Sequence, residues 1–211
     1  ERWGSEFACV GVGCVGIQDF QPQMTRIFVL IAIASSTVVG QEARWPTAAK
    51  DGFGTSTTLA SKVWFTLANG VMTEVFYPTV DSPKVKTLQL LVRADAKVES
   101  ELDDTIHRME LPQPASLTFR QVNTAKTGSY TITKTYVTDP KRSTVLIDVD
   151  LTTHSQAQLS VYYDPSLNNS GWHDSGRFEK NALVAVDKNV ASALVSSCGF
   201  EKAKSDAGVS K

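Results

Sequence analysis

The stretch SKVWFTLANGVMTEVFYPTVD, residues 61–81, decides the fold class. Two runs rich in aromatic and β-branched residues flank Asn69-Gly70, a dipeptide that suits the two positive-φ positions of a type I′ turn. Counting outward from this turn predicts a hairpin with these cross-strand pairs: Leu67 with Met72, Phe65 with Glu74, and Trp64 with Val75. Both faces of the hairpin carry large apolar side chains, which is typical of strands inside a packed sheet.

The rest of the chain beyond residue 50 shows the same strand character. Further strands are predicted over residues 87–93, 117–122, 129–138, 143–151, 158–163, 182–186 and 192–197. In the third of these segments the side chains that share one face are Tyr130, Ile132, Lys134 and Tyr136. Turn dipeptides such as Asp139-Pro140 separate the segments, and none keeps a helical period for three turns. Many short β-branched strands predict an all-β sandwich.

Composition and charge favour one ordinary globular domain. The chain has 211 residues, of which 42% are hydrophobic, and a formal net charge of -1. A near-neutral chain lacks the basic surface that nucleic-acid binding requires, so we expect no nucleic-acid partner. The glycine-rich run GVGCVG at 11–16 lacks the strand–helix context of a nucleotide loop, and we expect no cofactor. The acidic run ESELDD at 99–104 is expected to be a solvated loop.

The N-terminal part is expected to be a leader rather than part of the fold. From Met24 a basic residue, an apolar run and small residues follow in the order of a secretory signal peptide. The apolar run is shorter than the roughly 20 residues that span a membrane, and a buried core helix is the alternative. The expected divisions are an upstream or cloning-derived leader at 1–23, a signal peptide at 24–40, a linker at 41–49 and the domain at 50–211. The mature protein would be secreted or periplasmic and not membrane-bound.

Cysteine usage predicts a domain without an internal disulfide. Two of the three cysteines, Cys9 and Cys14, fall in the expected leader. Cys198 is then alone in the mature chain, within the strand-like run ALVSSCGF. We expect Cys198 to be a small buried hydrophobic residue rather than a reactive thiol.

The residues that carry chemistry form no recognisable catalytic set. None of the three histidines stands at a zinc-site spacing from another histidine or a cysteine, so no metal site is predicted. Ser170, His173 and Asp174 are close in sequence, but a catalytic triad usually assembles from separate elements. Paired carboxylates could serve glycoside hydrolysis, and the sequence alone does not pair them in space. Glu74 lies on an apolar face of the predicted hairpin, and we expect it to pair with an arginine or lysine rather than to act in catalysis.

The loop NNSGWHDSG, residues 168–176, holds the candidate sugar-binding residues. Carbohydrate sites use flat aromatic rings with polar edges, and Trp172 in this glycine-containing loop is the best candidate for an exposed ring. The candidate carbohydrate-binding set is therefore Trp172, His173 and Asp174. Packing of the loop against the domain is the alternative role for these residues.

Several motifs occur in a specific order along residues 50–211. They are DGFGT at 51–55, SKVWFTL at 61–67, TEVFYP at 73–78, DDTIHRMEL at 103–111 and YTITKTYVTDPKRSTVLIDV at 130–149. This ordered series resembles the N-terminal domain of bacterial glucoamylases and glucodextranases, in glycoside hydrolase family fifteen. The departures are mild: Phe76 stands where the family usually has tyrosine, and Lys86-Thr87 where Arg-Asp is common. The resemblance implies an antiparallel β-supersandwich of the galactose-mutarotase-like type.

The resemblance also implies a function. In the family this domain packs against an (α/α)6 barrel with two catalytic glutamates, and the parent enzymes release glucose from the non-reducing ends of α-glucans with inversion. The barrel is therefore the expected partner and an α-glucan the expected substrate of the parent enzyme. No catalytic residue is carried over to this chain, because its sequence stops before the barrel.

The expected function is thus an accessory N-terminal domain of a secreted hydrolase of the glucan 1,4-α-glucosidase type, inactive alone. A stand-alone carbohydrate-binding module is one alternative. An aldose-epimerase-like enzyme is another, and it would need a histidine and a carboxylate that converge on one concave face. His107 and Glu110 are the only such pair close in sequence.

Overall fold

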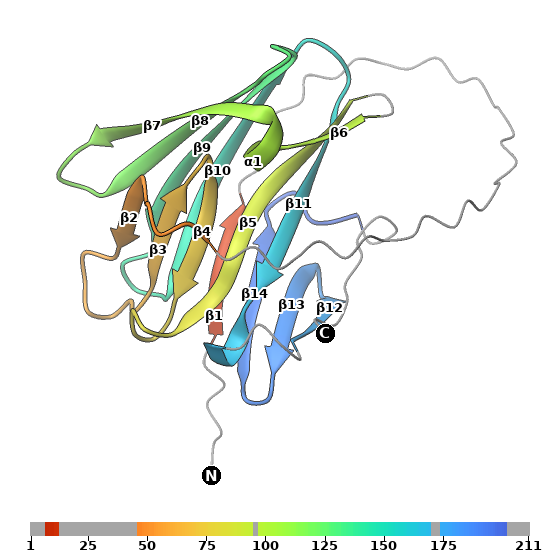
Figure 1. Cartoon of the computed structure of the whole chain (residues 1–211). Helices are drawn as coiled ribbons and strands as arrows, with labels where there is room; N and C mark the ends of the chain where they lie inside the picture. Colours follow the sequence, from red (N-terminus) through yellow and green to blue (C-terminus); the bar gives the residue numbers. More distant parts are fainter. Residues whose placement is uncertain (1–6, 13–45, 95–96, 170–173, 202–211) are drawn as a thin grey trace, which may run out of the picture.

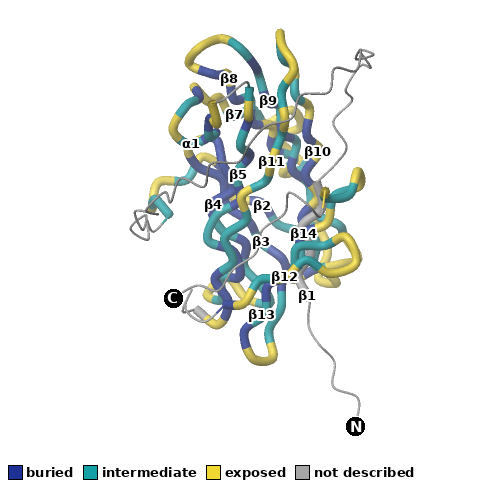
Figure 2. Tube along the Cα trace, turned by 90° about the vertical axis from the view of Figure 1, so that its right-hand side faces the viewer, coloured by how far each residue is buried: buried dark blue, intermediate teal, exposed yellow. Residues whose placement is uncertain are grey.

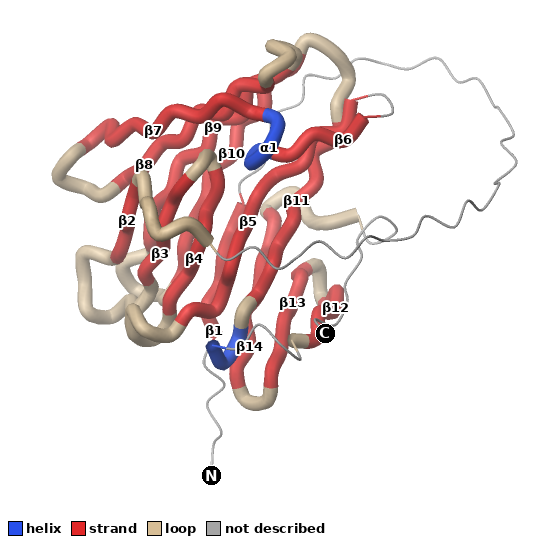
Figure 3. Tube along the Cα trace, in the orientation of Figure 1, coloured by secondary structure: helices blue, strands red, loops and turns tan. Residues whose placement is uncertain are grey.

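The computed structural model describes residues 7–12, 46–94, 97–169 and 174–201, and its strands form two sheets that pack face to face (Figure 1, Figure 3). In spatial order the eight-stranded sheet contains β12 (Ser175–Glu179), β13 (Ala182–Asp187), β14 (Val190–Ser196), β1 (Phe7–Val12), β10 (Thr144–Thr153), β9 (Tyr130–Thr138), β8 (Thr118–Ala125) and β7 (Thr105–Gln113). All of its pairings are antiparallel except those of β1, which runs parallel to both β10 and β14.

The second sheet has six strands and is antiparallel throughout. In spatial order it contains β11 (Gln158–Pro165), β5 (Pro83–Ala94), β4 (Val71–Phe76), β3 (Trp64–Ala68) and β2 (Gly52–Thr55), while β6 (Lys97–Ser100) pairs with the end of β5. Two short helices complete the described elements: α1 (Glu101–Asp104) and the 3-10 helix η1 (Leu167–Asn169). The predicted all-β antiparallel supersandwich is therefore confirmed.

The core lies between the two sheets. Inward-facing side chains of both sheets form one cluster: Phe65, Leu67, Met72, Leu88 and Leu90 from one, and Ile132, Tyr136, Val145, Ile147 and Leu194 from the other. The ring of Phe65 stacks on that of Tyr136 at 5.8 Å between centroids and meets the edge of Phe119 at 6.2 Å. Figure 2 shows the buried residues along the central strands and the exposed ones at the loops. Strand alternation thus builds the core as the sequence predicts.

The hairpin register differs from the prediction on one side of the turn. Leu67 pairs with Met72 as predicted, but a bulge between Thr66 and Leu67 places Glu74 opposite Thr66 rather than Phe65. The extra residue on the bulged strand is Thr73, and Phe65 then faces Val75. One inserted residue changes the face on which each later side chain lies, because side chains alternate with a period of two. The predicted apolar surroundings of Glu74 are therefore wrong.

The acidic run at 99–104 is not a solvated loop. It forms the end of β6 and helix α1, and Glu101 is only 1% exposed. Ser100 caps this helix, since its hydroxyl accepts a hydrogen bond from the Asp103 amide. The cap fixes the short helix so that its first residue points inward while Asp103 stays outside.

The expected leader contributes strand β1, which lies outside the predicted domain at 50–211. Cys198 is exposed and disulfide-bonded, so the expectation of a buried unpaired cysteine is wrong. The other two cysteines of the chain, Cys9 and Cys14, both belong to residues 1–23, which the sequence interpretation set aside. Residues 13–45 lie outside the described part, so the leader, signal-peptide and linker boundaries stay predictions. In the part of the chain that the structure describes, no helix is long and apolar enough to cross a membrane.

Candidate functional site

The most unusual polar feature is a fully buried ion pair between the sheets. Lys134 on β9 and Glu101 on α1 both have 0% side-chain exposure, and Lys134 Nζ lies 2.7 Å from Glu101 Oε1. Lys134 Nζ also donates to the Gly70 carbonyl at 2.9 Å, in the turn between β3 and β4. Asn123 on β8 donates through Nδ2 to the same carbonyl and to Glu101 Oε1, each at 2.7 Å. We call these four residues the buried ion-pair cluster.

The cluster satisfies its charges internally. The ammonium of Lys134 has three protons, and it meets both carboxylate oxygens of Glu101 and the Gly70 carbonyl. The amide of Leu90 donates to Glu101 Oε2 at 2.6 Å, and this hydrogen bond connects β5 to the cluster. Burial lowers the pKa of the Lys134 ammonium below its usual value, and the Glu101 carboxylate opposes that shift. Because all four of its residues are buried, the cluster joins two sheets and a helix rather than meeting a substrate.

A second polar group extends the cluster along the sheet. The Tyr136 hydroxyl donates to Gln121 Oε1 at 2.8 Å, and Gln121 Nε2 donates to the Val71 carbonyl at 3.4 Å. Burial, and then the charge of Glu101, raise the pKa of the Tyr136 hydroxyl well above its usual value. Tyr136 therefore stays neutral and acts as a hydrogen-bond donor.

Glu74 has the basic partner that the sequence predicts. Lys50 Nζ lies 2.6 Å from Glu74 Oε2, and both side chains are about one-fifth exposed, at 22% and 20%. The Thr66 hydroxyl donates to the same carboxylate, and the Glu74 amide donates to Thr66 Oγ1 at 3.1 Å. The prediction of an ion pair is confirmed, although about one-fifth of each side chain remains exposed. It fixes the segment before β2 to the hairpin.

The predicted sugar-binding set falls only partly within the described residues. Trp172 and His173 lie outside them. Asp174 is 2% exposed, and its Oδ2 accepts a hydrogen bond from the Leu167 amide at 3.0 Å. Burial raises the pKa of the Asp174 carboxyl, and the charges of Asp187 and Asp164 act in the same direction. Asp174 thus organises the turn at η1, and sugar binding by this set stays a prediction.

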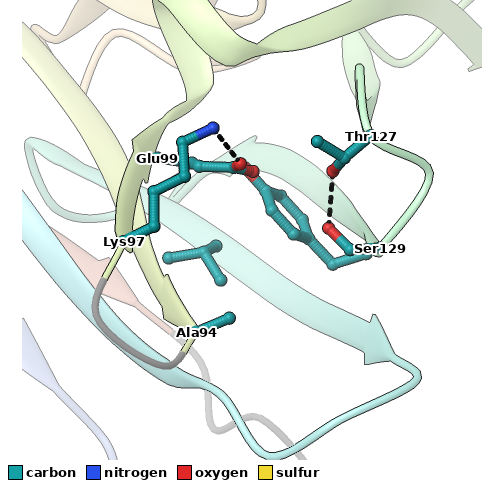
Figure 4. A pocket seen from close by; sticks show the side chains of 7 residues that line it. Ala94, Lys97, Glu99, Thr127 and Ser129 are labelled. Atoms are coloured by element: carbon teal, nitrogen blue, oxygen red, sulfur yellow. Dashed lines mark hydrogen bonds and ion pairs between the residues drawn. The ribbon is translucent and has the colours of Figure 1, made fainter.

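A cavity of about 220 Å³ is the second candidate site (Figure 4). Its lining comes from β5, β6, the β8–β9 turn and the first residue of β9: Val92, Ala94, Lys97, Glu99, Thr127, Ser129 and Tyr130. Lys97 Nζ pairs with Glu99 Oε1 at 2.6 Å, and the hydroxyls of Thr127 and Ser129 are 2.7 Å apart. Burial and the neighbouring Glu99 raise the pKa of the Tyr130 hydroxyl beyond its usual range. Sequence reasoning missed this cavity because its walls come from three separate segments.

The chemistry of the cavity is limited. It holds one carboxylate, already paired with Lys97, whereas glycoside hydrolysis uses two carboxyl groups that flank the bond. Across the described ranges, no group of three or more His, Cys, Asp or Glu side chains is placed to hold a metal ion. The pair His107 and Glu110 lies on edge strand β7, where Glu110 instead contacts Arg108 at 2.6 Å and Arg120 at 3.7 Å. The ion pairs of Glu110 favour a structural role for this residue rather than a catalytic pair with His107.

Fold and polar contacts together define the class: an antiparallel β-supersandwich domain whose buried polar residues hold its sheets together. The family model for domain N of glucodextranase matches residues 36–210, and the chain belongs to this family. The chain is similar to a glucoamylase of Clostridium sp. (strain G0005), with 38% identity in an alignment of 172 residues that covers 77% of this chain and 24% of that protein. A crystal structure of a bacterial glucoamylase complexed with acarbose is also similar, with a TM-score of 0.67 and 33% identity over 72% of this chain and 26% of that chain.

Proposed function

We propose that this chain is the accessory N-terminal domain of a secreted, glucoamylase-like α-glucan hydrolase. The observation that carries the proposal is the match of the glucodextranase N-domain model along 36–210, which includes thirteen of the fourteen strands that the structure describes, all but β1. The chain spans about a quarter of each glucoamylase that it matches, at 24% and 26% of their lengths. The family resemblance assigns the catalytic glutamates to a following barrel, so the domain supports chemistry that takes place elsewhere.

The geometry of the polar residues supports an accessory role. The buried ion-pair cluster is closed to solvent, and Glu74 is engaged by Lys50 and Thr66. A retaining or inverting glycosidase needs two carboxyl groups facing one open site. The cavity beside Tyr130 has one carboxylate in its lining, that of Glu99. The barrel of the parent enzyme is the proposed partner, and an α-glucan is the proposed substrate of the whole enzyme.

A glucose-release assay tests the proposal. The purified full chain is incubated with maltooligosaccharides and with dextran, and released glucose is measured against a blank. We expect no release, and the matched variants Glu74→Gln and Glu99→Gln should behave like the unchanged chain. Release that survives purification and disappears in either variant would overturn the accessory role.

A binding assay separates this role from a stand-alone carbohydrate-binding module. Gel electrophoresis in the presence of soluble amylose should leave the mobility of the chain unchanged. Retardation that is lost on Trp172→Ala would favour the carbohydrate-binding module and the predicted set at 172–174.

A further inference from the structure

The cavity beside Tyr130 has polar groups on two facing walls. Figure 4 shows Lys97 and Glu99 on one side of it and Thr127 and Ser129 on the other. The first wall belongs to the six-stranded sheet through β6, and the second belongs to the turn between β8 and β9 of the eight-stranded sheet. Glu99 and Tyr130 are buried, whereas Lys97 and Thr127 are exposed, so the cavity has a buried interior and an exposed rim.

The Tyr130 hydroxyl is the observation that points to a ligand. Tyr130 is 3% exposed, and its hydroxyl forms no hydrogen bond of normal geometry with the described residues. A buried hydroxyl without such a bond costs free energy, and most buried side-chain polar groups are therefore paired. Burial, and then the charge of Glu99, raise the pKa of the hydroxyl, so it stays protonated. It is a donor that an acceptor brought into the cavity would satisfy.

The volume of the cavity limits the size of the ligand. A volume of 220 Å³ is room for roughly seven water molecules at about 30 Å³ each. Sites for drug-sized ligands measure about 300–1,000 Å³. The cavity is therefore larger than a water site and smaller than a site for an extended ligand. A molecule of about the size of one sugar ring matches it.

The charges of the lining favour a neutral ligand. Lys97 and Glu99 carry the only formal charges among the seven lining residues, and they pair at 2.6 Å. An anion would meet the carboxylate of Glu99, and a cation would meet the ammonium of Lys97. Lys97 is 64% exposed, and an exposed ion pair holds its geometry weakly, so its side chain can swing aside when a ligand enters.

The remaining lining groups suit a molecule with hydroxyl groups. The hydroxyls of Thr127 and Ser129 are 2.7 Å apart, and each can both donate and accept a hydrogen bond. Val92 and Ala94 add apolar surface beside them. A sugar ring presents the same combination, with hydroxyl groups at its edge and C–H groups on its faces.

We propose that the cavity beside Tyr130 is a binding site for one neutral monosaccharide. The Tyr130 hydroxyl donates to an oxygen of the sugar, the Glu99 carboxylate accepts from a sugar hydroxyl, and Thr127 and Ser129 contact it from the facing wall. The site binds without catalysis, because its lining has one carboxylate and glycoside hydrolysis uses two. A cavity for one ring does not hold the interior units of a glucan chain, so the mobility expected in amylose gels is unaffected.

Titration of the isotope-labelled full chain with D-glucose, followed by NMR, tests the proposal. We expect saturable shifts in the amides of residues 97–100 and 127–130, with millimolar affinity because the contacts are few. Tyr130→Phe removes only the hydroxyl and should weaken binding about threefold to tenfold. Tyr162→Phe is the matched control, since Tyr162 is a half-exposed tyrosine of β11 outside the cavity lining, and it should bind like the unchanged chain. Absent or non-saturable shifts, or equal affinities for the two variants, would overturn the proposal.

Thermal unfolding separates binding from a structural role of the hydroxyl. Without sugar, Tyr130→Phe should melt at the same temperature as the unchanged chain or higher, because it removes an unsatisfied buried group. Glucose should then raise the melting temperature of the unchanged chain more than that of Tyr130→Phe. Sugars also stabilise proteins by exclusion from their surface, so sucrose, which is too large for the cavity, is the control and should raise both equally. A lower melting temperature of Tyr130→Phe without sugar, or the same increments with glucose as with sucrose, would refute a ligand-binding hydroxyl.

Discussion

Replacing Lys134 by methionine should strongly destabilise the domain. The change leaves the Glu101 carboxylate buried at 0% exposure, with only the Asn123 and Leu90 hydrogen bonds to compensate its charge. Removing one partner of a buried pair costs about 3–5 kcal/mol, because the remaining charge is uncompensated. Total stabilities are about 5–15 kcal/mol, so this is a large share of the free energy of unfolding. For a domain of this size the melting temperature should fall by about 6–20 °C.

Urea unfolding followed by circular dichroism measures this cost. The double variant Lys134→Met/Glu101→Gln removes both charges, so it should be more stable than Lys134→Met alone. Arg177→Met is the surface control. It breaks an ion pair with Glu179 in which both side chains are about half exposed, at 54% and 46%, and should cost less than about 1 kcal/mol. A loss below about 1 kcal/mol in Lys134→Met, or strict additivity in the double variant, would refute the reasoning.

The remaining predictions concern a turn, a buried carboxyl and the leader. Gly70→Val should lower the free energy of unfolding by about 1–3 kcal/mol or more, because Gly70 has a φ of 76° and a Cβ there would lie 2.8 Å from Asn123 Oδ1. Gly128→Val is the control for backbone strain alone, since Gly128 has a φ of 75° and open space around its Cβ position. Equal melting temperatures for the two variants would contradict a steric clash with Asn123. The Asp174 carboxyl has a raised pKa in the folded state, so above the ordinary value of 3.8 the folded protein binds more protons than the unfolded chain. Its contribution to the free energy of unfolding is present at low pH and is lost as pH rises through the folded pKa. Asp174→Asn should therefore make the urea midpoint depend less on pH, and an unchanged pH dependence would count against a raised pKa. Expression in a secreting host should give a new N-terminus near Gln41 to Ala43, which mass spectrometry can identify after reduction of the disulfide. Exported protein with residues 24–40 intact would argue against a signal peptide.

The strand faces could be predicted from the sequence because they depend on local alternation. Tyr130, Ile132, Lys134 and Tyr136 share a buried face as predicted. Counting residues outward from the Asn-Gly turn correctly predicted that Leu67 pairs with Met72, because no bulge lies between this pair and the turn. It failed from Thr66 onward because the bulge at Thr73 depends on the neighbouring strand β5 and on the Thr66–Thr73–Glu74 hydrogen bonds.

Strands with weak alternation were missed. β2 has the sequence GFGT, and a Cβ at Gly54 would lie 2.3 Å from the Phe65 ring, so glycine there reflects a close approach that only the fold reveals. β7 is an edge strand with mostly exposed side chains, and it lacks the apolar repeat that indicates a strand. β6 and β12 are short, with four and five residues. Local patterns do not identify strands that are fixed mainly by their neighbours.

The polar sites depend on contacts between distant residues, which the sequence does not order. Glu101 was assigned to a solvated loop because its partner Lys134 is 33 residues away. Glu74 was correctly expected to have a basic partner, but Lys50 could not be singled out from the other lysines and arginines. The walls of the cavity near Tyr130 come from segments that meet only in the folded state.

The burial of Lys134 has a consequence for synthesis of the chain on the ribosome. Lys134 contacts the Gly70 carbonyl, which is 64 residues earlier, and the Glu101 carboxylate, which is 33 residues earlier. At about 5–20 residues per second, roughly 3–13 s pass between synthesis of Gly70 and synthesis of Lys134. During this interval the Glu101 carboxylate has no ammonium partner, so its burial between the two sheets has to wait for β9. Closure of the sandwich is therefore later than formation of the β3–β4 hairpin, which can form while the chain is still growing.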